Sequence, residues 1–514
     1  MQAPHRTSVP LSEYVKALQS QGILSSYELP QGGAEARIDF ITADSREVVP
    51  GTLFVCKGRA FKREYLEGSL AGGAVAYLAE QAFEGVDAPR VLVSDVRRAM
   101  GVLADMLYGH PSGKLTTCAF TGTKGKTTCA YYLKSVLDAR AQALGTHATP
   151  IFSSVTLDDG VTCGPSKLTT PEAFELEAHF ANAVSVGARE LVMEASSQAL
   201  KYDRTYAVDF AVVGFTNIGE DHISPIEHPD FEDYFSSKLK VFAQAKCGVV
   251  SLDIDHAQRV LDTAKSGCQR VITCSERDET ADVFLERAQM GAQGVEMAVR
   301  TPRGRIEFTL PSPSHFNALN ALLVVGMAEG LGVEHEYVRA GLGAVSVPGR
   351  MQMVASPVEG IVPVVDFAHN GMSLEIVLRE LRQNYPGHQI CCVFGATGGK
   401  GIDRRDTMGV AAGKYADSIV ITEDDAGPER VEDICATIAR RVGEQGNTNW
   451  VIECDRERAI RLCLRDARRP AVVLVSGKGA ETTMIRANGP EPWEGDVPVL
   501  QRALSDLAQG RLDV

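Results

Sequence analysis

The apolar positions from about residue 115 onward form short continuous runs that alternate with helical patterns. These runs are rich in β-branched residues: LTTCAF at 115–120, ELVMEAS at 190–196, FAVVGFTNI at 210–218, GVVSLDI at 248–254 and RVITCS at 270–275. Continuous apolar runs separated by helices are typical of a parallel β-sheet that is covered on both faces. The pattern therefore predicts an α/β domain built on a parallel sheet.

A second series of apolar runs begins after VPGRM at 347–351, and it predicts a second doubly wound, Rossmann-like domain. Its runs are PVVDFAH at 363–369, QICCVFGAT at 389–397, SIVITEDD at 418–425, WVIECD at 450–455 and AVVLVSGKG at 471–479. A smaller segment precedes both series, and GHPSGK at 109–114 is a plausible linker after it. We expect three α/β domains, over residues 1–112, 113–346 and 347–514.

The length and the charge of the chain narrow the classes of protein to consider. A chain of 514 residues is too long for one hydrophobic core. Its net charge of −14 argues against nucleic acid as the main partner, although a local site can still be basic. No run of about 18 apolar residues is present to cross a bilayer, and the first residues lack the apolar core of a signal peptide. We expect a cytoplasmic protein without membrane insertion.

Twelve cysteines are scattered along the chain, several of them inside apolar runs, and none forms a CxxC pair. This distribution indicates reduced core residues rather than disulfides or a zinc site.

The stretch FTGTKGKTT at 120–128 has the character of a phosphate-binding loop. It matches the consensus GxxxxGK[ST] only in part, because Phe120 stands where the first glycine belongs. Gly122 and Gly125 still allow backbone N–H groups to converge on an anion, Lys126 adds charge, and the Thr127 hydroxyl suits Mg²⁺. The alternative is a plain glycine turn, but the order of strand, loop and helix favours a phosphate site.

Two further side chains stand at the ends of predicted strands. Glu194 ends one apolar run and His222 follows another. Each alone is as well explained as a solvated strand-end residue, but together with the loop they favour a site for a hard cation.

The chain also carries, in order, GTKGKTT, LTTPE, EASS, TNIGEDH, YFSSKLKVF, FNALN, PGRM, DFAH and GKGAE, preceded by DSR at 44–46. In this order the motifs resemble the Mur ligases of peptidoglycan synthesis, most closely the MurE type, the UDP-N-acetylmuramoyl-tripeptide synthetases. The resemblance runs from Asp44 to Glu481. It implies a UDP-sugar-binding first domain, a central P-loop ATPase domain and a third domain that binds the amino acid.

The activity implied by the resemblance is an ATP-dependent amide ligation in cell wall biogenesis. The γ-carboxylate of UDP-N-acetylmuramoyl-L-alanyl-D-glutamate would be activated as an acyl phosphate and would then react with the amine of a third amino acid. By the same resemblance, the ATP-binding residues are Gly122, Thr123, Lys124, Gly125, Lys126, Thr127, Thr128, Asn317, Asn320, Arg350 and Asp366. The UDP-substrate residues are Ser45, Arg46, Thr169, Thr170, Ser197 and Arg204. The family often has His-Gly after its ExSS motif, and this chain has Gln198 and Ala199 instead.

Lys238 receives a role only from the resemblance. Beside Lys240 it would ordinarily be taken for a solvated surface lysine, but its place in YFSSK matches the carbamylated lysine of the family. A carbamate is anionic and can hold Mg²⁺, which an ammonium group cannot. The implied metal ligands are Thr127, Glu194, His222 and carbamylated Lys238, and the implied catalytic residues are Lys126, Glu194, His222 and Lys238.

The amino acid to be added is predicted from a departure from the family pattern. Ligases specific for meso-diaminopimelate carry DNPR, in which the arginine holds the distal carboxylate. This chain has Asp424, Asp425, Ala426 and Gly427 at those positions, and AHNG at 368–371 also resembles lysine-adding ligases. We expect L-lysine or L-ornithine as the diamino acid, bound by His369, Arg405, Asp424, Asp425, Gly477 and Glu481.

Three alternatives remain open. One is the same ligation with meso-diaminopimelate. Another is a ligase like folylpolyglutamate synthase, which has no comparable UDP-binding first domain. The last is a catalytically silent nucleotide-binding protein. The expected partners are UDP-N-acetylmuramoyl-dipeptide, ATP with Mg²⁺ and a diamino acid, and the expected state is a monomer.

Overall fold

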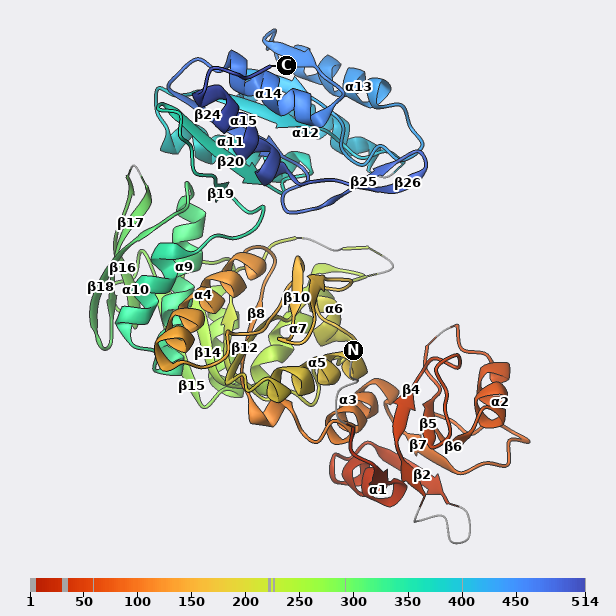
Figure 1. Cartoon of the computed structure of the whole chain (residues 1–514). Coiled ribbons are helices and arrows are strands. Elements are labelled where there is room, and N and C mark those ends of the chain that lie inside the picture. The colour runs from red at the N-terminus through yellow and green to blue at the C-terminus, as the bar shows by residue number, and fades with distance from the viewer. Residues whose placement is uncertain are drawn as a thin grey trace. The chain divides into compact units, whose positions relative to one another are not determined.

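The computed structural model describes residues 6–29, 36–58, 60–220, 223–224, 227–291, 293–399 and 401–513. The described residues form three large β-sheets and two small two-stranded ones, with helices between the strands (Figure 1). This architecture confirms the predicted α/β class. Within the described residues, no helix is both long enough and apolar enough to cross a membrane.

The first large sheet has the strand order β2-β7-β6-β5-β4, in which β4 to β7 run parallel and β2 runs antiparallel to β7. Helix α3 begins at Asp95, whose carboxylate accepts hydrogen bonds from the backbone N–H groups of Arg97 and Arg98. The elements of this part are β1 (Val9–Pro10), α1 (Leu11–Ser20), β2 (Leu24–Glu28), β3 (Arg37–Ile38), β4 (Phe40–Thr42), β5 (Thr52–Val55), α2 (Arg63–Ala71), β6 (Ala74–Ala79), β7 (Arg90–Val93) and α3 (Val96–Leu107).

The central sheet has the order β11-β10-β9-β12-β8-β13-β14-β15-β16-β17-β18. The consecutive neighbours β9, β12, β8, β13, β14, β15 and β16 run parallel, as the apolar runs predict. The elements up to β15 are β8 (Thr116–Thr121), α4 (Lys126–Leu144), β9 (Ile151–Phe152), β10 (Thr156–Asp158), β11 (Cys163–Pro165), α5 (Ala173–Ser185), β12 (Glu190–Glu194), α6 (Ser197–Lys201), β13 (Phe210–Phe215), α7 (Phe231–Leu239), β14 (Ala245–Ser251), α8 (Ala257–Gly267) and β15 (Arg270–Ser275).

Several strands of the central sheet lie outside the predicted doubly wound pattern. They are the antiparallel β10 and β11 and the three strands β16 (Val283–Gly291), β17 (Gly294–Thr301) and β18 (Gly304–Leu310), which precede α9 (His315–Leu331) and α10 (His335–Ala344). Buried and exposed positions are interspersed along β16 and β18. A strand with one exposed face has no continuous apolar run, so a prediction from apolar runs does not detect it.

The third large sheet has the order β19-β20-β24-β21-β22-β23 and is parallel except for β19. It agrees with the predicted Rossmann-like pattern. Its elements are β19 (Gln352–Met353), β20 (Ile361–Asp366), α11 (Gly371–Asn384), β21 (Gln389–Phe394), α12 (Ile402–Tyr415), β22 (Ser418–Ile421), α13 (Val431–Gly443), β23 (Trp450–Ile452), α14 (Arg456–Asp466) and β24 (Ala471–Ser476), followed by β25 (Thr483–Arg486), β26 (Gly489–Pro492) and α15 (Asp496–Ala508).

The chain divides into two compact units. The first comprises Met1–Leu285, Val299–Ile306 and Leu322–Gly341, and the second comprises Glu286–Ala298, Glu307–Ala321 and Leu342–Val514. Inside the first unit, Ala173 of α5 belongs to the same hydrophobic core as Leu103 of α3, so these two helices pack together.

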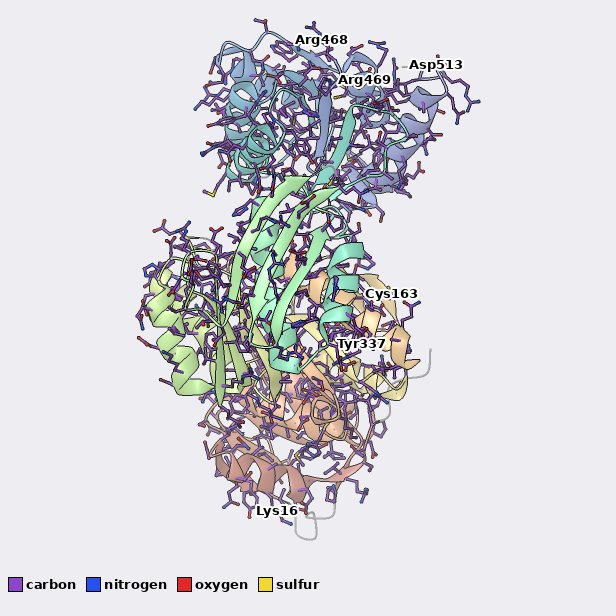
Figure 2. The ribbon with its side chains drawn as sticks, turned by 90° about the vertical axis from the view of Figure 1, so that its left-hand side faces the viewer. Lys16, Cys163, Tyr337, Arg468, Arg469 and Asp513 are labelled. Atoms are coloured by element: carbon purple, nitrogen blue, oxygen red, sulfur yellow. The ribbon has the colours of Figure 1, made fainter. Side chains whose placement is uncertain are left out.

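All twelve cysteines are free thiols, and nine of them are buried, in agreement with the expected reduced core residues. Cys163 on β11 is exposed (Figure 2).

Candidate active site

The phosphate loop lies between β8 and α4, in the centre of the parallel sheet. Gly122 has a φ of +141° and Gly125 a φ of +85°, both in the region that favours glycine. A Cβ atom at Gly122 would lie 2.0 Å from Thr216 Oγ1, so a larger residue does not fit there. Asn217 Oδ1 accepts a hydrogen bond from the backbone N–H of Lys124 at 2.9 Å. The end of β13 therefore fixes the loop from the side.

The lysine of the loop folds back over it. Lys126 Nζ donates to the carbonyl oxygens of Gly122 at 2.9 Å and Thr123 at 3.1 Å. This places a positive charge beside the converging backbone of the loop, where a phosphate group would bind.

Glu194 and Thr127 meet below the loop. Glu194 is the last residue of β12, which pairs with β8, and it is buried. Its Oε1 accepts hydrogen bonds from Thr127 Oγ1 at 2.8 Å and from the backbone N–H of Ser154 at 2.8 Å. Ser154 Oγ also lies 3.0 Å from Thr127 Oγ1. The motif reading did not select Ser154, because a serine in a loop carries no signal of its own.

Lys238 on α7 is buried and contacts the same loop. Only 1% of the residue is exposed, and Nζ donates to the carbonyl oxygen of Gly122 at 2.7 Å. Nζ also lies 4.5 Å from the centroid of the Tyr234 ring, and the Tyr234 hydroxyl donates to Thr123 Oγ1 at 3.1 Å. The ordinary expectation of a solvated lysine is therefore wrong for this residue.

The donor set at the loop suits a hard cation. The Thr127 hydroxyl and the Glu194 carboxylate are oxygen ligands in direct contact, and Mg²⁺ commonly takes one or two protein oxygens together with substrate phosphates and water. Within the part of the chain that the structure describes, no group of three or more His, Cys, Asp or Glu residues forms a metal site. His222, the third predicted ligand, lies outside the described residues.

The predicted contacts to the muramoyl-dipeptide lie beside Glu194. Thr170 is buried, and its Oγ1 donates to the Glu194 carbonyl oxygen at 2.8 Å, while Arg204 Nη1 donates to the Thr170 carbonyl oxygen at 3.1 Å. Thr169 is the partly exposed neighbour of Thr170. Ser197 is buried, and its Oγ lies 3.1 Å from His228 Nε2.

His228 is a further residue of this site that the sequence does not predict, because it belongs to no motif. Its Nδ1 lies 2.6 Å from Asp233 Oδ2, and burial lowers the pKa of its imidazole. The neutral ring can thus accept a hydrogen bond from Ser197 and hold that side chain in one orientation.

Ser45 and Arg46, predicted near the uridine, line a cavity of about 1050 Å³ in the first unit. In the structure Arg46 Nε donates to Asp44 Oδ1 at 2.8 Å, and this bond lowers the pKa of the Asp44 carboxyl to about 2.

In the second unit, the predicted adenine and ATP contacts are set by short hydrogen bonds. Asn317 Nδ2 donates to Ser312 Oγ at 2.8 Å, and Asn320 Nδ2 donates to Asn317 Oδ1 at 3.2 Å. Asp366, at the end of β20, accepts from the backbone N–H groups of Met351 at 2.7 Å and Ala368 at 2.8 Å. Burial raises the pKa of the Asp366 carboxyl, while Arg350 opposes this rise.

The predicted amino-acid site in the third sheet contains a lysine that the motif reading overlooked. Lys478, between the predicted residues Gly477 and Glu481, is 1% exposed. Its Nζ lies 2.8 Å from Asp425 Oδ1 and 2.5 Å from Glu481 Oε2. Although burial opposes its charge, these two carboxylates raise the pKa of Lys478.

The acidic side chains nevertheless outnumber this lysine. Burial raises the pKa of both Asp424 and Glu481, which shows that each carboxylate is costly to ionise there. Asp425 Oδ1 also accepts from the backbone N–H of Ile485 on β25 at 2.8 Å. Asp424 also faces the buried guanidinium of Arg456, which is itself paired with Asp496. With Asp496 counted, four carboxyl groups share the two cations Lys478 and Arg456, an arrangement that a further cation would stabilise.

The remaining predicted residues flank this cluster. Arg405 is buried, and its Nη2 donates to the Thr397 carbonyl oxygen at 3.2 Å and contacts Glu429 at 2.9 Å. His369 Nδ1 lies 2.8 Å from the carbonyl oxygen of Phe367. Gly427, at the position of the arginine in the diaminopimelate motif, has a φ of +56°.

Comparisons with known proteins agree with this arrangement. Residues 120–328 match the Mur ligase middle domain, and residues 349–479 match the glutamate ligase domain of Mur ligases. The chain is 33% identical over 493 residues to the UDP-N-acetylmuramoyl-L-alanyl-D-glutamate–L-lysine ligase of Enterococcus faecalis, covering 93% of this chain and 96% of the relative. It is 35% identical over 477 residues to a UDP-N-acetylmuramyl-tripeptide synthetase of Bifidobacterium longum, covering 90% and 91%.

Solved structures show the same fold. A UDP-N-acetylmuramoyl-L-alanyl-D-glutamate–2,6-diaminopimelate ligase superimposes with a TM-score of 0.72 at 24% identity, covering 98% of this chain and 99% of the other. A folylpolyglutamate synthase of Mycobacterium tuberculosis gives 0.57 at 17% identity and covers 80% of this chain. Because two domain families match in order and relatives align over at least nine-tenths of its length, this chain belongs to the Mur ligase family.

Proposed function

We propose that the protein is the ATP-dependent ligase that adds L-lysine to UDP-N-acetylmuramoyl-L-alanyl-D-glutamate in peptidoglycan synthesis, with L-ornithine as the alternative amino acid. The observation that carries the choice of amino acid is the replacement of the diaminopimelate-binding arginine by Gly427 beside three carboxyl groups. The relative from Enterococcus faecalis named above, an L-lysine ligase, supports the same choice.

The reaction proceeds in two steps. An oxygen of the D-glutamyl γ-carboxylate attacks the γ-phosphorus of ATP, ADP leaves, and an acyl phosphate forms. The amine of the incoming amino acid then attacks the acyl carbon and loses a proton, and inorganic phosphate leaves. Lys126 and the backbone N–H groups of the loop bind the phosphates and stabilise the negative charge that develops during transfer.

Mg²⁺, when bound, would neutralise part of the charge on the phosphates. Thr127 and Glu194 would hold it, with His222 and carbamylated Lys238 as the further ligands that the family resemblance implies. The burial of Lys238 against the loop supports this role, because a carbamate there would present oxygen atoms to the phosphate site.

The charges around Lys478 explain the preference for an amino acid with a terminal ammonium. Asp424, Asp425 and Glu481 lie around Lys478, and the other cation beside Asp424, Arg456, is already paired with Asp496. A second ammonium would therefore be attracted by the excess negative charge. The distal carboxylate of meso-diaminopimelate would instead meet carboxylates and no arginine at position 427. The loss of one charged hydrogen-bonding partner costs about 1.5–3 kcal/mol, or at least roughly tenfold in selectivity.

A direct test measures phosphate release from ATP by the purified protein in three mixtures. Each contains Mg²⁺ and L-lysine together with UDP-N-acetylmuramoyl-dipeptide, a folate with L-glutamate, or no acceptor. Release with the UDP-dipeptide alone supports the proposal. Release with folate would point to a folylpolyglutamate synthase activity, and release with none would point to a silent nucleotide-binding protein. We further propose that the enzyme acts in the cytoplasm as a monomer.

A further inference from the structure

A small cationic cavity lies beside α3 and α6 in the first unit. Its volume is about 170 Å³, and basic side chains from three segments line it: Lys57 after β5, Arg97 in the first turn of α3 and Arg204 after α6. Neither Lys57 nor Arg97 belongs to one of the sequence motifs described above.

One carboxylate holds two of these side chains in place. Glu172 Oε2 lies 3.0 Å from Lys57 Nζ, and Glu172 Oε1 lies 2.8 Å from Arg204 Nη2. Although burial opposes it, Lys57 and Arg204 together lower the pKa of Glu172. The Arg97 guanidinium lies 3.9 Å from the centroid of the Tyr202 ring, which keeps it at the wall of the cavity.

The charges of the cavity are not balanced. Asp203, the other acidic residue in its lining, lies 3.6 Å from Arg98. Three cationic side chains therefore face the single carboxylate of Glu172. In addition, Arg204 Nε is buried, and among the described residues it has no hydrogen-bond acceptor. An anion would satisfy this donor and the excess positive charge together.

The cavity connects two parts of the proposed substrate site. Lys57, Met100 and Glu172 also line the cavity of about 1050 Å³ that contains Ser45 and Arg46. On its other side, Arg204 donates to the carbonyl oxygen of Thr170. A nucleotide sugar with uridine near Ser45 and its peptide near Thr170 would have its two phosphate groups between these points.

We propose that Lys57 and Arg97, together with Arg204, bind the diphosphate of the nucleotide-sugar substrate, and that Glu172 pairs with Lys57 until the phosphates replace its carboxylate. This inference rests on the proposed function for the identity of the ligand. Its ligand chemistry, a nucleoside diphosphate, follows from the position of the cationic cavity between the two predicted ends of the substrate.

The test compares the binding of UDP and of uridine to the full chain by isothermal titration calorimetry. Lys57→Gln and Arg97→Gln are each expected to weaken UDP binding at least about tenfold, since each removes a charged hydrogen-bond donor, and to leave uridine binding within about twofold. Arg63→Gln is the matched control, because Arg63 is an exposed arginine of the same domain that pairs with Glu67 on α2, and it should change neither ligand. Glu172→Gln should tighten UDP binding, because it removes the competing carboxylate.

Unchanged UDP affinity in both Lys57→Gln and Arg97→Gln would overturn the diphosphate assignment. Equal losses for UDP and uridine would overturn it as well, since they would indicate a general disturbance of the pocket. Weaker UDP binding in Glu172→Gln would refute the displacement step. Each of these failures is distinct from a failure of the proposed function, which would appear as a wild-type protein that binds UDP but releases no phosphate with the UDP-dipeptide.

Discussion

The ammonium nitrogen of Lys238 lies 2.7 Å from the carbonyl oxygen of Gly122, the first glycine of the phosphate loop. A lysine on a helix thus reaches the loop across 116 positions of sequence, and it does so while almost completely buried. At this position a carbamate on the Lys238 nitrogen would present its oxygen atoms to the phosphate loop.

From this position we predict that Lys238→Ala is nearly inactive and that formate partly restores its activity. A small carboxylate can enter the space left by the side chain and supply the oxygen that a carbamate would have supplied. Initial rates of phosphate release with and without formate measure this. Lys240→Ala, a change at an exposed neighbour, should behave like the wild type. Full activity of unrescued Lys238→Ala would refute the role of this lysine.

Lys126→Ala should abolish ligation and leave the binding of the UDP-dipeptide nearly intact. The Lys126 ammonium contacts the loop carbonyls of Gly122 and Thr123, where it would bind the ATP phosphates and not the nucleotide sugar. Loss of one donor to a developing charge typically costs about 10²–10³ in rate. Calorimetry with the UDP-dipeptide and an assay of turnover separate the two effects. Substantial remaining turnover, or lost binding of the sugar nucleotide, would count against this assignment.

The ion pair between the partly buried His179 and the buried Asp159 should make the free energy of unfolding depend on pH in the alkaline range. His179 Nδ1 lies 2.6 Å from Asp159 Oδ2. Burial alone would lower the pKa of this histidine, but Asp159 and Glu175 raise it from 6.5 to about 9. The protonated ring therefore stabilises the folded state fully below pH 6.5, and this stabilisation is lost as the pH rises through about 9.

We expect the contribution of this pair to be about 2 kcal/mol near neutral pH, after allowance for partial exposure of the ring. Melting temperatures of the wild type and of His179→Gln, measured from pH 6 to about pH 10, should differ most at the acidic end and converge at the alkaline end. A difference that stays constant across this range would show that the histidine carries no charge in the folded protein.

Asp425→Asn should weaken the use of L-lysine by removing one of the three carboxylates around Lys478. We predict a KM for L-lysine that rises about tenfold, with a smaller change in kcat, because the lost charge acts mainly on binding. Glu432→Gln, at an exposed position of α13, is the control for a change of charge in the same domain. An unchanged KM in Asp425→Asn would contradict this prediction, because it would mean that Asp425 pairs with Lys478 but does not help to bind L-lysine.

The sequence predicts the parallel sheets well, because strands buried on both faces leave continuous apolar runs. It does not predict β16 and β18, whose exposed positions interrupt such runs, nor β17, which lies between them in the sheet. The phosphate loop is predicted equally well, because its glycines with positive φ and the following lysine are close together in the sequence.

Other parts of the site depend on distant contacts that no local pattern contains. Lys478 lies inside the predicted motif GKGAE but receives its role from Asp425, 53 positions away. Lys57 and Glu172 meet across 115 positions, and His228 is brought to Ser197 across 31. Only the family resemblance gives Lys238 a role, because its place in the sequence is otherwise that of a surface lysine.

The central claim, ligation of a diamino acid with a terminal ammonium, is tested most directly by competition in one tube. The wild-type enzyme is given ATP, Mg²⁺ and UDP-N-acetylmuramoyl-dipeptide with equal concentrations of L-lysine, L-ornithine and meso-diaminopimelate, and the products are separated by mass. We predict that the lysine or ornithine product exceeds the diaminopimelate product at least roughly tenfold, with lysine favoured. A dominant diaminopimelate product would contradict the assignment.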